Sequence, residues 1–261
     1  MLDSKETPII KEAMKSSHEC KEILEHQQKL QETTMTMQKL VAQKTQQLWK
    51  LQNAVISILA DLVDCRDEVT GGHVFRTQKY LGRLIDKLLE EGVYTDQLLA
   101  WDLDFVIPSA QLHDLGKLCI KDTLLHKPGP LSQAEFHEIK SHVDIGVDAI
   151  TRMERLADNQ NFLFHAKLFA GTHHEKWDGT GYPNHLSGHQ IPLEGRLMAI
   201  VDVYDALISM RPYKQALTPA QAKAVIIEGR GTQFDPQIVD VFAMVADEFA
   251  MFADTGSAPC C

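Results

Sequence analysis

This sequence has no apolar stretch near the roughly 18 residues that a membrane-spanning helix needs. Its start, MLDSKETPIIKEAMKSS, lacks the apolar centre of a secretory signal. Aromatic residues make up only 7% of the 261 residues, and long polar–apolar alternations are missing, which argues against a β-sandwich or barrel. The five cysteines follow no disulfide or zinc spacing, which favours a reduced, cytoplasmic environment.

Basic residues are scarce relative to acidic ones. The chain has 26 Lys and Arg against 36 Asp and Glu, a formal net charge of −10, which excludes the electrostatic footprint of a protein that binds duplex nucleic acid or anionic membranes. A small phosphate ligand stays compatible with this charge, because bound metal ions reverse the local sign. The number of histidines, twelve, is unusually high. Their positions along the chain indicate what the protein does.

A heptad pattern precedes the histidines. Apolar residues recur alternately four and three apart, with Lys44 as the one strongly polar position, at Met37, Val41, Leu48, Leu51, Val55, Ile58 and Leu62. This spacing predicts a coiled-coil helix over residues 30–64, about 50 Å long, that joins two chains in parallel. A helix packed on its own domain is the alternative, and the last turns are expected to join the core. Residues 1–29 are polar and show no firm pattern.

Residues 65–252 predict a domain of helices, and residues 253–261 a disordered tail. Gly71-Gly72 ends the first helix, and a helix through Leu118 is expected to carry His113 and Asp114. Ser132 and Glu135 form a capping-box pattern at the start of a helix that runs to about Leu156. Turn signals and proline-led starts define the remaining segments, at 161–172, 192–209, Pro219 and Pro236. The sequence therefore predicts an all-α fold.

The pair His113-Asp114, followed by Gly116 and Lys117, lies where an apolar helix should be buried. Taken alone, such a pair is more often a satisfied core hydrogen bond than a metal site. Asp202 changes the odds, because it interrupts an apolar stretch where a carboxylate is costly unless it binds a metal or a cation. Four more histidines complete a set that could supply two divalent ions with one bridging carboxylate: His73, His142, His173 and His174. Nitrogen and oxygen ligands without thiolates suit Fe, Mn, Co or Ni.

Along the chain the order is His73, His113-Asp114-x-Gly116-Lys117, His142, His173-His174-Glu175-x-Trp177-Asp178-Gly179-x-Gly181-Tyr182-Pro183 and then Asp202. The pattern resembles the HD-GYP branch of the HD-domain phosphohydrolases, and the similarity runs from about Leu51 to Phe249. It includes Lys127-Pro128-Gly129-Pro130-Leu131, Arg211-Pro212-Tyr213-Lys214 and Gly231-Thr232-Gln233-Phe234-Asp235-Pro236. The resemblance implies an all-α HD-domain bundle with C-terminal HD-GYP helices, preceded by a long coiled-coil-like helix.

The resemblance also implies a role for each site residue. One ion would be held by His73, His113, Asp114 and Asp202. Asp114 would bridge to a second ion, which His142, His173 and His174 would hold. Iron is the expected metal, with manganese as the alternative. Asp114 and Lys117 are the expected catalytic residues, and substrate would be bound by Lys117, Arg211, Lys214 and Tyr182.

The implied reaction is hydrolysis of cyclic di-GMP to linear pGpG by a metal-bridged hydroxide. Two ions lower the pKa of a bridging water towards about 7, and Lys117 adds positive charge where negative charge develops. Members with a third metal carry a glutamate four residues before the first histidine, where this chain has Val69. A two-metal site is therefore expected, and further hydrolysis to GMP is left open. The alternatives are another cyclic dinucleotide, such as cyclic GMP-AMP, and a non-catalytic signalling module that binds a cyclic dinucleotide.

The expected partners are the cyclic dinucleotide, a second copy of the chain through the N-terminal helix, and a GGDEF-type or receiver-type signalling protein. Neither duplex nucleic acid nor a membrane is expected. His165 and Trp101 are expected to pack rather than bind ligand, whereas His189 shares the loop of Tyr182. Asp205, one helical turn after Asp202, is expected either to support a ligand or to pair with Arg211.

Overall fold

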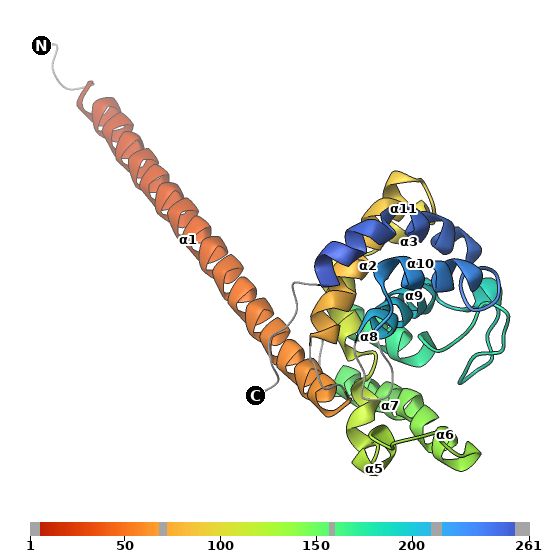
Figure 1. Ribbon diagram of the computed structural model, residues 1–261. Helices are drawn as coiled ribbons and strands as arrows, with labels where there is room; N and C mark the ends of the chain where they lie inside the picture. The colour runs from red at the N-terminus through yellow and green to blue at the C-terminus, as the bar shows by residue number, and fades with distance from the viewer. Residues whose placement is uncertain (1–5, 68–71, 157–159, 210–215, 254–261) are drawn as a thin grey trace, which may run out of the picture. The chain divides into compact units, whose positions relative to one another are not determined.

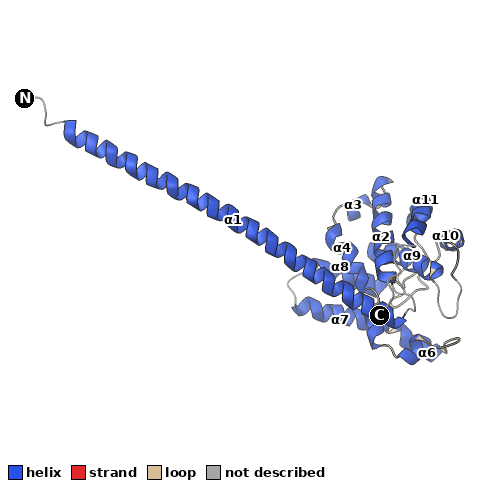
Figure 2. Cartoon of the chain, turned by 60° about the vertical axis from the view of Figure 1, so that its left-hand side comes forward, coloured by secondary structure: helices blue, strands red, loops and turns tan. Residues whose placement is uncertain are grey.

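The computed structural model describes residues 6–67, 72–156, 160–209 and 216–253, and the chain divides into two compact units, residues 1–54 and 55–261. Every named element in the described ranges is a helix (Figure 2). Extended pairing there is limited to two isolated bridges, Asp178 with Ser187 and Arg230 with Phe234. The all-α prediction is confirmed. Among the described helices, none combines the length and the apolar character that crossing a membrane requires.

The described residues of the first unit, 6–54, are part of helix α1, which runs from Glu6 to Asp67. The helix therefore begins well before residue 30, where the heptad pattern predicts its start. Nothing between Ile9 and Thr70 interrupts it, because that range contains neither proline nor glycine. Pro8 lies in the first turn, where its missing N–H removes no hydrogen bond within the helix.

The last turns of α1 belong to the second unit and have two apolar faces. Ile56 and Val63 are buried among side chains of the second hydrophobic cluster, including Leu112, Ile150 and Phe162. The prediction that these turns join the core is confirmed. The heptad residues lie on a different face and are exposed: Val55, Ile58 and Leu62. The same turns thus fill the core and still present the predicted coiled-coil seam.

The rest of the second unit is a set of short and medium helices (Figure 1). In chain order, with 3₁₀ turns written η, they are α2 (His73–Glu90), α3 (Thr95–Leu98), α4 (Leu103–Ser109), η1 (Ala110–Leu112), η2 (Leu115–Cys119), α5 (Asp122–Leu125), α6 (Gln133–Lys140), α7 (His142–Leu156), α8 (Gln160–Thr172), η3 (Gly188–Gln190), α9 (Leu193–Ile208), α10 (Pro219–Glu228) and α11 (Pro236–Ala253). The capping box of Ser132 and Glu135 forms as predicted, and Thr218 forms another with Gln221.

The largest core lies where α2, α9, α10 and α11 pack together. Aromatic rings fill its centre. Tyr80 of α2 stacks on Phe249 of α11 with ring centroids 4.6 Å apart, and Tyr204 and Phe242 meet Phe249 edge-on. These side chains are fully buried. The core fixes α2 and α9 against each other, and each of these helices carries predicted ligands.

Two predicted helix boundaries are wrong. The helix expected through Leu118 ends at Ser109 and gives way to the 3₁₀ turns η1 and η2. The helix expected to reach Leu156 is broken at Ser141, whose hydroxyl donates to the carbonyl of Glu138 and competes with the helical backbone. Cys119 is a free, exposed thiol.

We predict that Phe249→Ala lowers the free energy of unfolding by about 3–5 kcal/mol, because it removes a buried ring that contacts three others. Met251→Ala on the same helix is the control, since Met251 is exposed and its truncation should cost no more than about 0.5 kcal/mol. Urea unfolding of both variants measures the difference. Equal losses would contradict this description of the core.

Candidate metal centre

Seven histidine and aspartate side chains gather in two ligand groups. The first ligand group is His73, His113 and Asp202, and the second is Asp114, His142, His173 and His174. Within each group, one ligand atom from every residue lies within 4.8 Å of the others. The described part of the chain holds no other such group. These are the seven ligands that the sequence predicts, brought together from segments up to 129 positions apart in the chain.

Asp114 lies between the two groups. Its Oδ2 is 3.3 Å from Nε2 of His113, in the first group. Its Oδ1 is 3.3 Å from Nε2 of His142 and 3.6 Å from Nε2 of His173, in the second. One carboxylate therefore faces both groups, which is the arrangement that a bridging ligand needs.

The ligands stand mainly at the ends of helices. His73 is the first residue of α2, His142 is the first of α7, and His173 and His174 follow α8. Asp202 is the exception, because it projects from the middle of α9. Helix ends suit this task, since their unpaired backbone groups can orient a nearby ring.

Carbonyl groups at these ends hold the imidazole rings. Nδ1 of His113 donates to the carbonyl of Ala110 at 2.9 Å, and Nδ1 of His142 donates to that of Ile139 at 2.7 Å. His173 donates in the same way to the carbonyls of Phe169 and Ala170. A proton held on Nδ1 leaves the lone pair of Nε2 free to bind an ion.

The residues fit a pair of metal ions. Nε2 of His142, Nε2 of His173 and Oδ1 of Asp114 are buried, and none has a hydrogen-bond partner in the described structure. Buried polar atoms are costly without a partner, and an ion supplies one. The donors are nitrogen and oxygen with no thiolate, a set that suits iron, manganese, cobalt or nickel.

The pKa values set the charges of the second group. Burial raises the pKa of Asp114, but Lys117 and His113 lower it by more, so that it falls well below the ordinary value. Burial lowers the pKa of His173, and burial together with His173 lowers the pKa of His174. Asp114 is therefore a carboxylate and His173 and His174 are neutral imidazoles, the protonation states that bind metal.

A buried ion pair contacts His73 of the first ligand group. Asp205 accepts hydrogen bonds from Nε of Arg76 at 2.7 Å and from Nη2 at 2.8 Å, and its Oδ2 lies 2.9 Å from Nδ1 of His73. Burial lowers the pKa of His73, yet its contact with Asp205 outweighs this and raises the pKa to about 10. Asp205 therefore supports a predicted ligand, which is the first of the two roles that the sequence analysis expects for it. A metal ion must displace a proton from His73.

The turn η2 presses its backbone against α7. A Cβ built on Gly116 would lie 1.9 Å from the carbonyl oxygen of His142 and 2.7 Å from the amide nitrogen of Gly146. Only glycine allows this approach. It brings Asp114, the residue before η2, beside His142. It also explains why His113 and Asp114 sit between two 3₁₀ turns rather than on the single helix that the sequence predicts. Nζ of Lys117 then lies 2.8 Å from Oδ2 of Asp114.

The loop after α8 covers the second ligand group. The ring of Tyr182 stacks on His174 with centroids 4.7 Å apart, and Nζ of Lys140 lies 4.5 Å from the centre of the same ring. Glu175 is buried and accepts the N–H groups of Asn184 and Leu186, which holds the loop in place.

Other residues fall where packing is expected. His165 is buried beside Glu194, 2.7 Å from its carboxylate, and meets Trp101 edge-on. His189 meets Trp177 edge-on rather than the ligand groups. Three predicted positions lie outside the described residues: Val69, Arg211 and Lys214.

A family model for the HD domain matches residues 35–238. The chain belongs to the HD domain family. The resemblance found in the sequence is confirmed, because a cyclic di-GMP phosphodiesterase of Vibrio cholerae is 47% identical over 77% of this chain and 40% of its own length. A probable cyclic di-GMP phosphodiesterase of the same organism is 42% identical over 84% of this chain and 51% of its own length. A 3'3'-cGAMP-specific phosphodiesterase 2, also from Vibrio cholerae, is 39% identical over 73% of this chain and 34% of its own length. This HD-domain chain spans between about a third and a half of the length of these relatives.

Sequence reasoning assigned no role to four residues that shape this HD-domain site. Arg76 and Glu175 act through buried hydrogen bonds, and Lys140 and Gly116 through close packing. Arg76 had a readable signal, because it lies three positions after His73 on an amphipathic helix and so shares its face. Glu175 adjoins the histidine pair, but its partners are backbone amides that no side-chain pattern marks.

We predict that Gly116→Ala lowers the free energy of unfolding by about 1–3 kcal/mol or more and reduces the metal bound after purification. The added methyl group would collide with the backbone of α7 and push Asp114 away from His142. Gly82→Ala is the matched control: its Cβ would lie 3.6 Å from Ile107, and helix propensity favours alanine by about 0.5–1 kcal/mol. Thermal unfolding and elemental analysis measure both effects. A Gly116→Ala protein with normal stability and metal content would refute the close contact.

Proposed function

We propose that this chain hydrolyses cyclic di-GMP to linear pGpG, using two divalent transition-metal ions, with iron first and manganese as the alternative. The observation that carries the proposal is the placement of Asp114, one carboxylate between two ligand groups, with the Lys117 ammonium 2.8 Å away. The relatives support the substrate class, since two of those above are named for cyclic di-GMP. Because that messenger is bacterial and intracellular, the proposal places the chain in the cytoplasm.

When bound, the ions activate water and neutralise phosphate charge. The residues of the chain do the rest. Asp114 would keep the two ligand groups at a fixed separation from each other, and its low pKa keeps its side chain an ionised carboxylate throughout. Lys117 would contact the scissile phosphate and stabilise the charge that develops there. Water oxygen forms a bond to phosphorus, the bond from phosphorus to the 3′-oxygen breaks, and that oxygen takes a proton. The product is a linear dinucleotide with a 5′-phosphate.

Tyr182, Arg211 and Lys214 are proposed to hold the rest of the substrate. The stacking of the Tyr182 ring on His174, a member of the second ligand group, supports this role. Arg211 and Lys214 rest on the resemblance alone. With Val69 in place of the glutamate of three-metal members, we propose that this chain stops at pGpG rather than continuing to GMP.

A second substrate has support. The relative named for 3'3'-cGAMP is 39% identical to this chain, not far below the cyclic di-GMP enzymes. Another cyclic dinucleotide therefore stays the alternative. A module that binds without catalysis is disfavoured, because a binding role requires neither two complete ligand groups nor a lysine beside the bridging carboxylate.

We predict that Asp114→Ala loses both metal binding and hydrolysis, because this carboxylate faces both ligand groups. Lys117→Ala should keep about two ions per chain and lose about 10²–10³-fold in rate, since its ammonium acts on the transition state. Lys121→Ala is the control, an exposed lysine in the same segment that should change neither. Elemental analysis and turnover of cyclic di-GMP and 3'3'-cGAMP separate the cases. Full turnover by Lys117→Ala would remove this lysine from the mechanism.

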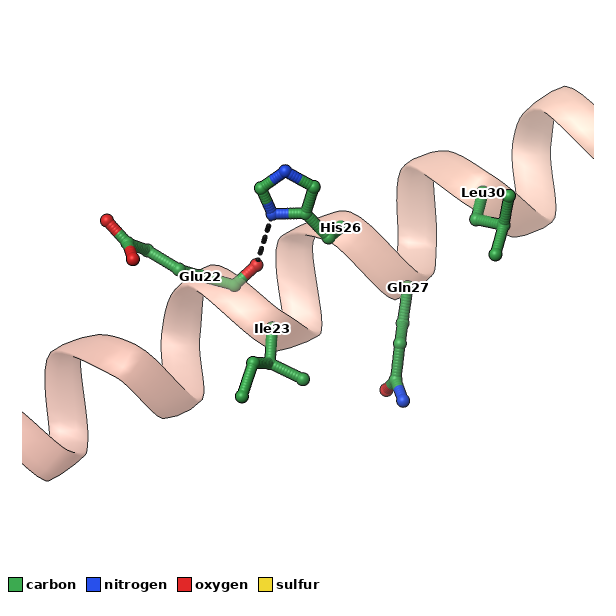
Figure 3. Close-up of a pocket in the computed structure, with 5 residues that line it drawn as sticks. All are labelled: Glu22, Ile23, His26, Gln27 and Leu30. Atoms are coloured by element: carbon green, nitrogen blue, oxygen red, sulfur yellow. Dashed lines mark hydrogen bonds between the residues drawn. The ribbon is translucent and has the colours of Figure 1, made fainter.

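We also propose that α1 joins two chains in a parallel coiled coil. The predicted seam residues are exposed along the helix, for example Leu48 at 67% and Leu51 at 62%. The four-and-three spacing continues further towards the N-terminus, through Leu30, Gln27 and Ile23. Figure 3 shows these three side chains on one side of the helix, with Glu22 and His26 on the other. An apolar strip of this length is typical of an interface, and a second copy fits it best because the seam is self-complementary. A GGDEF-type or receiver-type partner as the source of input stays a prediction.

Lys44 provides a matched test of the seam. Lys44→Leu should tighten the dimer, because it replaces the one charged seam position, whereas Lys39→Leu lies off the seam and should not. Leu51→Lys should weaken the dimer. Sedimentation of the three variants over a concentration series measures the association. A monomeric full-length chain at about 50 μM would reject the dimer, and α1 would then serve its own domain only.

A further inference from the structure

Arg66, in the last turn of α1, holds the backbone that follows the HD motif. Its Nη1 donates to the carbonyl of Leu118 at 2.5 Å and, more weakly, to that of Lys117 at 3.5 Å. Its Nη2 donates to the carbonyl of Ile120 at 2.9 Å and to the carboxylate of Asp122 at 2.6 Å. One guanidinium thus gathers successive acceptors from a single short segment. Arginine suits this task because its donors form a rigid planar fork.

These carbonyls lie at and just after the end of η2, where the last carbonyls of a 3₁₀ turn lack a partner within the turn, although that of Lys117 also accepts the amide of Ile120. Asp114 directly precedes η2, and Gly116, the second residue of η2, packs against α7. The segment is therefore held at three points: by the ligand groups, by α7 and by Arg66. Lys117 lies between the second and third points.

The same turn of α1 also reaches the first ligand group. The buried carboxylate of Asp64 accepts the N–H of Val74 at 2.9 Å, which places it at the start of α2, directly after His73. Asp64 and Arg66 are two positions apart. One turn of α1 is thus bonded to the backbone beside a ligand on α2 and to the backbone beside Lys117.

We propose that Arg66 is a positioning residue for catalysis: by clamping the end of η2 it holds the Lys117 ammonium beside Asp114. The inference rests on the proposed function for its kinetic readout only. Because Arg66 is part of α1, a rotation or shift of that helix would be transmitted to Lys117 through these bonds. The turn that carries Asp64 and Arg66 is then the physical link between the arm and the catalytic lysine.

The decisive variant is Arg66→Gln, which keeps a polar side chain and removes the charged fork. Arg66→Lys keeps the charge without the planar geometry and tests partial rescue. Arg83→Gln is the matched control, because Arg83 makes a comparable two-pronged pair with Glu248 away from the ligand groups. All three are made in the full chain loaded with Mn²⁺, and thermal unfolding confirms that each is folded.

Two readouts are taken. Hydrogen exchange follows the amides of Lys117 and Ile120, which donate to the carbonyls of Asp114 and Lys117 and so report the integrity of η2. Steady-state hydrolysis of cyclic di-GMP is measured for Arg66→Gln both alone and in the Lys117→Ala background. The second comparison is a double-mutant cycle, which shows whether Arg66 acts through Lys117.

We expect Arg66→Gln to speed exchange at these two amides by about tenfold and to lower kcat by about tenfold, with KM within about twofold and bound Mn²⁺ unchanged. Arg66→Lys should recover part of kcat, and Arg83→Gln should match the parent. In the Lys117→Ala background, Arg66→Gln should change kcat by less than about twofold. Unchanged exchange, or equal kcat losses with and without Lys117, would overturn the proposal. A parent protein that hydrolyses no cyclic dinucleotide would overturn the proposed function instead, and exchange would still decide whether Arg66 holds η2.

Discussion

The carboxylate of Asp114 is the group on which this structure depends. It is buried, and burial alone would favour its neutral form. Lys117 and three imidazoles surround it, and together they keep it charged. None of these partners can be removed without leaving a buried charge poorly compensated, a loss that costs several kcal/mol. The helices are therefore arranged around a charge that the core would otherwise exclude.

Backbone contacts hold these partners in place. The carbonyls of Ala110, Ile139 and Phe169 orient three of the rings, and Gly116 lets η2 meet α7 without a side chain between them. Such contacts are short-range and stiff. They explain how a site assembled from helix ends, in a described structure without named strands, keeps seven candidate ligands in two groups, each with its ligand atoms within 4.8 Å of one another.

Helix α1 serves two purposes through two faces. In its last turns Val63 fills the core, Asp64 and Arg66 bind the backbone near the ligand groups, and Leu62 remains exposed. A helix presents its faces at fixed angles, so the exposed strip and the buried strip must turn together. This geometry makes the end of α1 the place where an event on the exposed face is coupled to the position of Lys117.

The sequence by itself determined the helical class and the heptad strip, because periodicity is a local property of the chain. It also predicted seven candidate ligands, from their residue types and from the family resemblance, and the structure gathers those seven side chains in two groups. The sequence placed His113 and Asp114 on a regular helix, whereas the structure places them between two 3₁₀ turns. The tertiary structure decided that η2 is a 3₁₀ turn, that Asp205 belongs to Arg76 and His73, and that Arg66 meets carbonyls more than 50 positions away. The 3₁₀ turn and the Arg66 contacts depend on backbone groups, which leave no mark in the sequence, and the Asp205 contacts join side chains that lie far apart along the chain. They appear only when packing brings two segments together.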